Sequence, residues 1–102
     1  MKFINTDFEG LWVIETESKS DGRGFLTRLF CKNEFDKINF HKEFVQENLT
    51  LTKAKGTFRG LHYQVPPHSE AKLVRSISGK VLDIVIDIKK NSKTFLKSYI
   101  LE

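Results

Sequence analysis

The segment TFRGLHYQ, residues 57–64, gathers side chains that could do chemistry in one strand-like run. Arg59 offers a cation and His62 an imidazole, with Gly60 between them. Because successive side chains of a strand point to opposite faces, regular pairing would send Arg59 and His62 to different faces. A β-bulge at Gly60, the residue type that permits one, would turn both side chains to the same face. We therefore expect a bulge at this glycine.

Two amide side chains support a site on the neighbouring strand. Gln46 and Asn48 alternate along FVQEN, where a core strand would carry apolar residues. Several polar groups on one face of short strands are typical of a pocket lining. A lone strand histidine is more often a hydrogen-bonded structural residue, and this alternative stays open for His62. The polar face beside it favours a site.

The clearest local prediction is a hairpin in AKLVRSISGKVLDIVIDI, residues 71–88, that turns at Ser78 and Gly79. Glycine supplies the positive φ that a tight two-residue turn needs. In that register Lys72 and Asp83 are diagonal neighbours on a face otherwise lined by valines. Burying an ion pair among apolar side chains costs desolvation energy. The pair is therefore either functional or placed at a rim, and the pattern leaves both interpretations open.

Other site chemistries have weaker support. The histidines at positions 41, 62 and 68 include no pair one residue apart on a strand, and no cysteine or glutamate joins them in a ligand-like pattern, so we expect no metal. Cys31 has no histidine near it in sequence, which predicts an ordinary thiol and no nucleophile. No glycine-rich phosphate loop opens a helix.

Short strands rich in β-branched and aromatic residues must position these groups. One helical segment is expected at residues 33–40, where Asn33 can cap a short turn and Phe35 and Ile38 fall three apart. The spacing predicts an all-β fold, a sandwich or partial β-barrel of the jelly-roll type with one short helix. The expected strands are residues 11–16, 25–31, 43–52, 57–64, 71–77, 81–88 and 95–101.

Length and composition limit the alternatives. With 102 residues, of which 39% are apolar and 29% charged, the chain is expected to form a single domain over residues 1–102. No stretch approaches the roughly 20 apolar residues of a membrane span. The N-terminus carries acids where a signal peptide would be apolar, so we expect a cytoplasmic protein with no membrane partner.

Charge is distributed unevenly along the chain. Residues 1–50 carry a net charge of −2 and residues 51–102 a net charge of +6, which predicts an anionic partner for the second half. The lysines of that half are spread through turn-like segments and are not gathered on one helix face. A nucleotide or sugar phosphate therefore fits at least as well as a nucleic acid.

Taken together, the motifs resemble one known family in content, order and spacing. They are DGRGF, FVQEN, FRGLHYQ, AKLVR, SGKVLDIVIDI and NSKTF, and they cover nearly the whole chain from about residue 3. This pattern resembles the dTDP-4-dehydrorhamnose 3,5-epimerases. The resemblance implies a cupin-type jelly roll that binds a thymidine-diphosphate 4-keto-6-deoxy sugar and inverts carbons beside the ketone. It further implies that no metal or organic cofactor is used, and that N-terminal strands of a dimer help to build the partner's site.

The resemblance also assigns roles to individual residues. It makes His62 the base that removes a proton, and it places Lys72 near the ketone oxygen, where a cation stabilises the developing negative charge. Asp83 completes the implied catalytic set. Arg59 is placed at the diphosphate, because its fork geometry suits phosphate oxygens. The other substrate-binding residues implied are Arg23, Phe25, Arg28, Gln46 and Asn48.

The sequence departs from the family pattern in one binding residue and in its length. Arg28 stands where family members usually carry a glutamate that helps to hold the nucleotide, and this charge reversal bears on nucleotide preference. The sequence ends at Glu102, short of a full family domain, so the resemblance implies a truncated, N-terminal half of the epimerase. Further strands, the tyrosine that donates a proton and the acid that partners the histidine would lie in the other half.

Several functions stay open on this evidence. The first is an epimerase-like isomerase of the dTDP-rhamnose pathway, active or inactive without the other half, and the second is a non-catalytic nucleotide-sugar or carbohydrate-binding cupin. A nucleic-acid-binding barrel is third, because exposed aromatic platforms interleaved with basic residues are lacking. We expect Arg23, Arg59, His62 and Lys72 to converge on one cavity.

The expected assembly follows from the sheet. A sheet cut after residue 102 would leave unpaired edges and apolar faces, which invite association. We therefore expect a homodimer or higher oligomer in which strands are exchanged between subunits.

Overall fold

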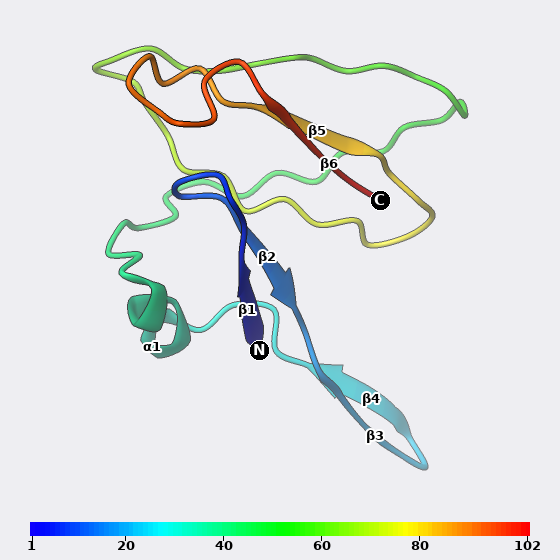
Figure 1. The fold of residues 1–102 in the computed structure, drawn as a ribbon. Coiled ribbons are helices and arrows are strands. Elements are labelled where there is room, and N and C mark those ends of the chain that lie inside the picture. Colours follow the sequence, from blue (N-terminus) through cyan, green and yellow to red (C-terminus); the bar gives the residue numbers. More distant parts are fainter. The chain divides into compact units, whose positions relative to one another are not determined.

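The computed structural model describes residues 1–102, which divide into two units. Unit 1 comprises Met1–His41 together with Ser76–Glu102, and unit 2 comprises Lys42–Arg75. All helices and strands belong to unit 1 (Figure 1). Neither the length nor the apolar content of a membrane-spanning helix is found in this structure. The regular structure is thus mainly β with one short α-helix, as predicted, and the strands form small sheets with no closed barrel.

The strands of unit 1 form three antiparallel pairs. In the first, β1 (Lys2–Asn5) pairs with β2 (Trp12–Glu15), and Phe3 lies opposite Ile14. The Thr6 hydroxyl folds the connecting loop, because it donates to the carbonyl of Leu11 at 2.8 Å and accepts the backbone N–H of Phe8 at 3.2 Å. Such local side-chain to backbone bonds are what favour threonine in turns.

The second pair is a tight hairpin made by the sequence DGRG. Strand β3 (Ser18–Asp21) pairs with β4 (Gly24–Thr27), and Asp21 lies opposite Gly24. The Asp21 carboxylate accepts the backbone N–H of Arg23 at 2.8 Å, which closes the turn. Gly24 has φ of +140°, a conformation that favours glycine. Strand β4 is therefore confirmed at the start of the predicted segment 25–31 and ends earlier than expected.

The third pair joins β5 (Asp83–Ile86) to β6 (Ser98–Leu101). Asp87 anchors the intervening loop: only 9% of it is exposed, and its carboxylate accepts the Thr94 hydroxyl at 2.7 Å and the Lys89 N–H at 2.9 Å. Hydrogen bonds from Ser92, Thr94 and the Lys89 backbone lower the pKa of Asp87 to about 2. The loop network therefore holds the two strands together.

The predicted helix forms, but it begins earlier than expected. Helix α1 spans Lys32–Phe35 and continues into a 3-10 turn, η1 (Asp36–Ile38), which Asn39 ends with φ of 57°. The N-cap is Cys31, not Asn33, and no side chain caps the helix. Phe35 anchors the helix, because it is only 3% exposed and packs against other rings. Burying a phenylalanine contributes about 2–3 kcal/mol, which exceeds the ~1 kcal/mol of a side-chain cap.

Aromatic side chains make the core of unit 1. The ring of Phe35 lies 5.3 Å from that of Phe3, 4.9 Å from Phe30 and 5.6 Å from Phe40, measured between centroids. Phe8 is also buried and meets Tyr99 of β6 edge-on at 5.8 Å. These contacts join α1 to β1 and the first loop to β6, so aromatic packing supplies the connections between elements that the small sheets lack.

Unit 2 contains no helix or strand, so the strands predicted at 43–52, 57–64 and 71–77 are wrong. The predicted hairpin turn is formed only locally: Gly79 has φ of +78°, but β5 pairs with β6 and not with residues 71–77. Hydrogen bonds to Asp87 in the connecting loop stabilise the pairing of β5 with β6. A pairing with residues 71–77 would lack such bonds, and a two-stranded hairpin alone is only marginally stable in water. The β-propensity of these segments therefore finds no partner within the chain.

Local hydrogen bonds shape unit 2 instead. Gly56, with φ of +79°, sits in a turn in which the Thr57 hydroxyl donates to the Ala54 carbonyl at 2.8 Å. A second turn follows at residues 65–68, where the His68 N–H donates to the Val65 carbonyl at 2.8 Å. The peptide bonds Gly60–Leu61 and Pro66–Pro67 are cis.

Candidate functional site

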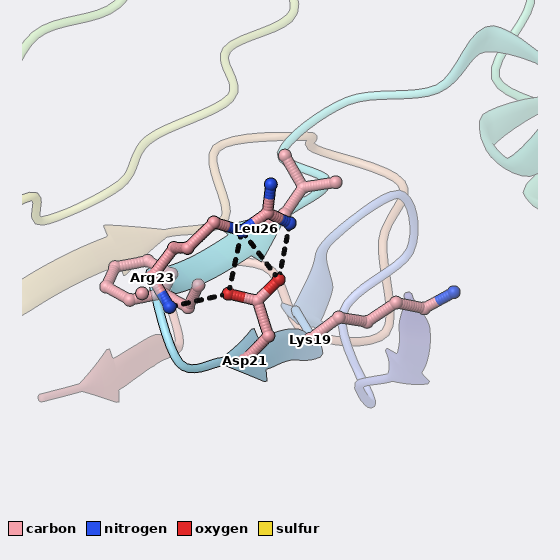
Figure 2. A pocket seen from close by; sticks show the side chains of 6 residues that line it. Lys19, Asp21, Arg23 and Leu26 are labelled. Atoms are coloured by element: carbon pink, nitrogen blue, oxygen red, sulfur yellow. Dashed lines mark hydrogen bonds and ion pairs between the residues drawn. The ribbon is translucent and has the colours of Figure 1, made fainter.

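A surface hollow of about 270 Å³ lies on the β3–β4 hairpin (Figure 2). Arg23 and Asp21 form its polar wall, with 2.6 Å between Nη2 of Arg23 and Oδ2 of Asp21. The side-chain hydrogen bond from Arg23 lowers the pKa of Asp21, and the same bond raises the pKa of Arg23. The full lining is Lys19, Asp21, Arg23, Gly24, Phe25 and Leu26.

This hollow combines positive charge with apolar surface. Figure 2 shows the Lys19 side chain extending away from the Asp21–Arg23 pair, so the two cations do not share the one carboxylate. Phe25 is 76% exposed beside them. A cation next to an exposed ring suits a ligand that carries both a phosphate and a flat apolar group.

The sequence predicted two members of this hollow, Arg23 and Phe25, and missed Lys19. A signal for Lys19 was present, because Lys19 and Asp21 are two residues apart on β3 and therefore share a face. The strand itself was not predicted, since its sequence SKSD has no apolar alternation and all four residues are exposed.

Arg28 has a partner within the chain. Its Nη1 donates to Oε1 of Glu34 at 3.0 Å, and the other carboxylate oxygen of Glu34 lies 3.1 Å from the amine of Met1. The hydrogen bond from Arg28 lowers the pKa of Glu34 and raises that of Arg28. The charge of Arg28 is therefore partly compensated by α1, and Arg28 does not line the hollow.

In unit 2, Arg59 is held by neutral acceptors. Its Nε donates to the Thr52 hydroxyl at 3.1 Å and its Nη2 to the Leu51 carbonyl at 3.5 Å. These bonds orient the guanidinium without cancelling its charge, so the positive charge stays available for an anion.

The backbone departs from a regular strand at Gly60, with φ of +111°. The β-bulge predicted at this residue is wrong, because residues 57–64 form no paired strand. The imidazole of His62 lies against Gly60: a Cβ placed on Gly60 would be 3.4 Å from Nδ1 of His62 and 3.7 Å from Cε1.

Lys72 pairs with a neighbour in its own unit. Its Nζ lies 2.9 Å from Oε1 of Glu70, and both side chains are about half exposed. Asp83 lies on β5 opposite Leu101 and is partly buried. The predicted register that would have made Lys72 and Asp83 diagonal neighbours is therefore wrong, because β5 takes β6 as its partner.

Unit 2 also has a hollow of about 220 Å³, which brings together two segments of that unit. Gln46 is part of it and Asn48 is not. The lining residues are Lys42, Glu43, Phe44, Val45, Gln46, Ser69, Glu70 and Ala71. The sequence predicted only Gln46 here, since the approach of residues 69–71 to residues 42–46 depends on the path of the chain.

The predicted site residues thus divide between the units. Arg23, Phe25, Arg28 and Asp83 belong to unit 1, while Gln46, Asn48, Arg59, His62 and Lys72 belong to unit 2. Their convergence on one cavity stays a prediction, as does the single domain. No group of three or more His, Cys, Asp or Glu side chains is arranged to hold a metal ion.

Comparison with known proteins decides the family. The model of the dTDP-4-dehydrorhamnose 3,5-epimerase family matches residues 5–102, which include every predicted site residue. The chain belongs to this family. The resemblance seen in the motifs is thereby confirmed. No solved structure matches the chain significantly.

Curated members of the dTDP-4-dehydrorhamnose 3,5-epimerase family extend the match. The chain is 40% identical over 98 residues to the enzyme of that name from Shigella flexneri, covering 95% of this chain and 54% of the relative. It is 36% identical to the enzymes of that name from Methanothermobacter thermautotrophicus and Escherichia coli K12, with 92% and 95% of this chain and 50% and 52% of the relatives covered. The chain therefore spans about half the length of the curated relatives it matches.

Proposed function

We propose that this chain binds a dTDP-linked 4-keto-6-deoxy sugar and takes part in inverting carbons beside its ketone. The observation that carries the proposal is the family match over residues 5–102. That match includes the basic and aromatic side chains of the β3–β4 hollow as well as the FRGLHYQ and AKLVR motifs.

Proton transfer is the central step of the proposed reaction. A ketone acidifies the hydrogens on its neighbouring carbons, so a base can remove one of them to leave an enolate. We assign this step to the imidazole of His62, which receives the proton while the electron pair moves to the ketone oxygen. Return of a proton to the opposite face of the carbon completes the inversion.

Lys72 is assigned to the ketone oxygen and stabilises the enolate by its positive charge. Its present partner Glu70 does not prevent this role, because an ion pair between half-exposed side chains separates at little cost. Asp83 stays in the proposed catalytic set through its place in the motif.

The binding groups fit the two ends of the ligand. Arg59, oriented by Thr52 and Leu51, is assigned to the diphosphate because its charge is not cancelled by a carboxylate. Arg23 and Phe25 are assigned to the nucleotide, with Gln46 and Asn48 as polar contacts. Arg28 has the least support among the proposed ligands, since it lies outside the hollow. A carboxylate accepts its hydrogen bond, as Asp21 does for Arg23.

We also propose that the working protein is a cupin-type jelly roll formed by a homodimer or higher oligomer with exchanged strands. Large apolar side chains stay exposed in the single chain, among them Val45 at 91% and Leu49 at 83%, and a buried partner surface would cover them. The cytoplasmic location stays a prediction.

A second candidate function is nucleotide-sugar binding without catalysis. The β3–β4 hollow favours it, because this hollow contains phosphate-binding and ring-stacking groups but none of the proposed catalytic residues. Binding of single-stranded DNA is the third alternative. Calorimetric titration with dTDP, a dTDP-sugar and single-stranded DNA separates the three ligand classes.

Solvent exchange tests the proposed chemistry. We expect incubation with the dTDP-linked keto sugar in deuterated water to place deuterium on a carbon beside the ketone, as measured by NMR, even if net inversion does not follow. The variant His62→Asn should lose this exchange at least tenfold while keeping its affinity for dTDP, because the cationic ligands remain. His68→Asn, an exposed histidine of the same unit, is the matched control and should exchange normally.

Binding without exchange above the buffer rate in the unmodified chain would instead establish the second candidate. A His62→Asn variant that exchanges as fast as the unmodified chain would remove His62 from the mechanism.

A further inference from the structure

Gly60 is in closer contact with a proposed catalytic side chain than any other glycine of the chain. The three atoms nearest to a Cβ built on Gly60 all belong to His62: Nδ1 at 3.4 Å, the backbone N at 3.5 Å and Cε1 at 3.7 Å. The ring therefore folds back over residue 60 with its Nδ1–Cε1 edge against that backbone. A methyl group at position 60 would meet this edge at ordinary van der Waals distance, so the strain of a substitution comes from the backbone.

The backbone of Gly60 gives a second reason for glycine. With φ of +111°, Gly60 lies in a region that L side chains rarely adopt. Gly24, Gly56 and Gly79 also have positive φ, but a Cβ at any of them would meet nothing within 4 Å. Those three glycines are not in contact with a functional side chain, whereas Gly60 combines a positive φ with a contact to the imidazole of His62.

We propose that Gly60 is a positioning residue for His62, an inference that rests on the proposed function of His62 as the base. The positive φ of Gly60 sets the direction in which the backbone enters His62, whose Nδ1–Cε1 edge lies against residue 60 and whose other edge points away from it. A general base must hold its nitrogen within hydrogen-bond reach of the carbon-bound proton. A displacement of about 1 Å can cost a hundredfold in rate.

The contact is tested first in the unmodified chain. We expect a nuclear Overhauser effect between the Hα protons of Gly60 and the ring Hε1 of His62, with the ring signals assigned by their loss in His62→Asn. Its absence from a well-dispersed spectrum would overturn the proposal, whatever the variants do.

Variants at residue 60 then test whether this residue controls the position of the His62 ring and the rate of solvent exchange. Gly60→Ala should shift the imidazole ¹⁵N resonances of His62 and lower solvent exchange into the keto sugar about tenfold or more, with dTDP affinity changed less than about threefold. Gly56→Ala is the matched control, because it places the same methyl at a positive φ with no contact, and it should leave both readouts unchanged. Wild-type exchange and unshifted ring signals in Gly60→Ala would overturn the proposal.

A synthetic variant covers the case in which Gly60→Ala does not fold. Gly60→D-Ala accepts a positive φ without strain and directs its methyl to the other side of Cα, so we expect it to retain exchange and the normal ring signals. Loss of exchange in this variant would count against the proposal. Failure of exchange in the unmodified chain itself would instead reject the proposed function, while the ring signals still decide the contact.

Discussion

At the scale of single residues, Asp87 shows how one buried carboxylate organises its surroundings. It accepts hydrogen bonds from a hydroxyl and from a backbone N–H, and these bonds lower its pKa to about 2. All of its partners lie within ten residues of it in sequence. The network is therefore local, although it determines which strand pairs with β5.

The depressed pKa makes the stability of unit 1 depend on pH. A carboxyl whose pKa is lower in the folded than in the unfolded state stabilises fully above the ordinary value, 3.8, and loses that contribution as pH falls towards 2. We expect the urea midpoint of unfolding to fall through this window. Asp87→Asn should lower the midpoint at pH 7 and flatten its pH dependence, since the variant lacks the titrating group.

Asp7→Asn is the control for this experiment, because Asp7 is an exposed carboxylate of the same unit. A midpoint at pH 7 that is equal in Asp87→Asn and Asp7→Asn would contradict the role of the network.

At the scale of elements, the β5–β6 hairpin contains a strained position. Leu96 has φ of +61°, and its N–H donates to the Asp87 carbonyl at 2.7 Å. Its side chain is 67% exposed, so little packing compensates for the left-handed backbone. The hydrogen bonds at the end of the loop hold this conformation against the steric preference of leucine.

Relief of this strain is measurable. The left-handed conformation costs an L-residue about 1–2 kcal/mol, and glycine loses about 0.5–1 kcal/mol in chain entropy. Leu96→Gly should therefore raise the free energy of unfolding by about 0.5–1 kcal/mol, which denaturant unfolding can resolve. Leu96→Ala removes the side chain and keeps the strain, so it should give no gain. Equal stability of the two variants would show that the backbone at this position is not strained.

At the scale of the whole molecule, the exposed apolar side chains predict association. Segments 43–52, 57–64 and 71–77 have strand-like sequences but form no strand within the chain. Unpaired backbone groups and apolar side chains favour pairing with another chain. The assembly is therefore where these segments are expected to find partners.

Light scattering at micromolar concentration tests this prediction. We expect a mass of at least twice 11.9 kDa, together with slowed amide exchange in residues 43–52 relative to a diluted sample. A monodisperse species of 11.9 kDa across the concentration range would rule out the proposed oligomer.

The local features of this protein were determined by its sequence. Gly79 adopts a positive φ where the pattern required it, the short helix forms around Phe35, and β2, β4, β5 and β6 overlap the predicted strands. The order of the motifs identified the family. Each of these properties depends on neighbouring residues or on the motif order alone.

Strand pairing was decided only by the tertiary structure. β1 and β3 formed without a clear apolar pattern because a short connection gave each a partner, the loop 6–11 for β1 and a tight turn for β3. Three strongly β-prone segments of the chain remained without a partner. Likewise, Lys72 forms its ion pair with Glu70 and not with Asp83, and β5 pairs with β6. The physical reason is that a strand satisfies its backbone hydrogen bonds through another segment, so its formation depends on which partner the fold provides.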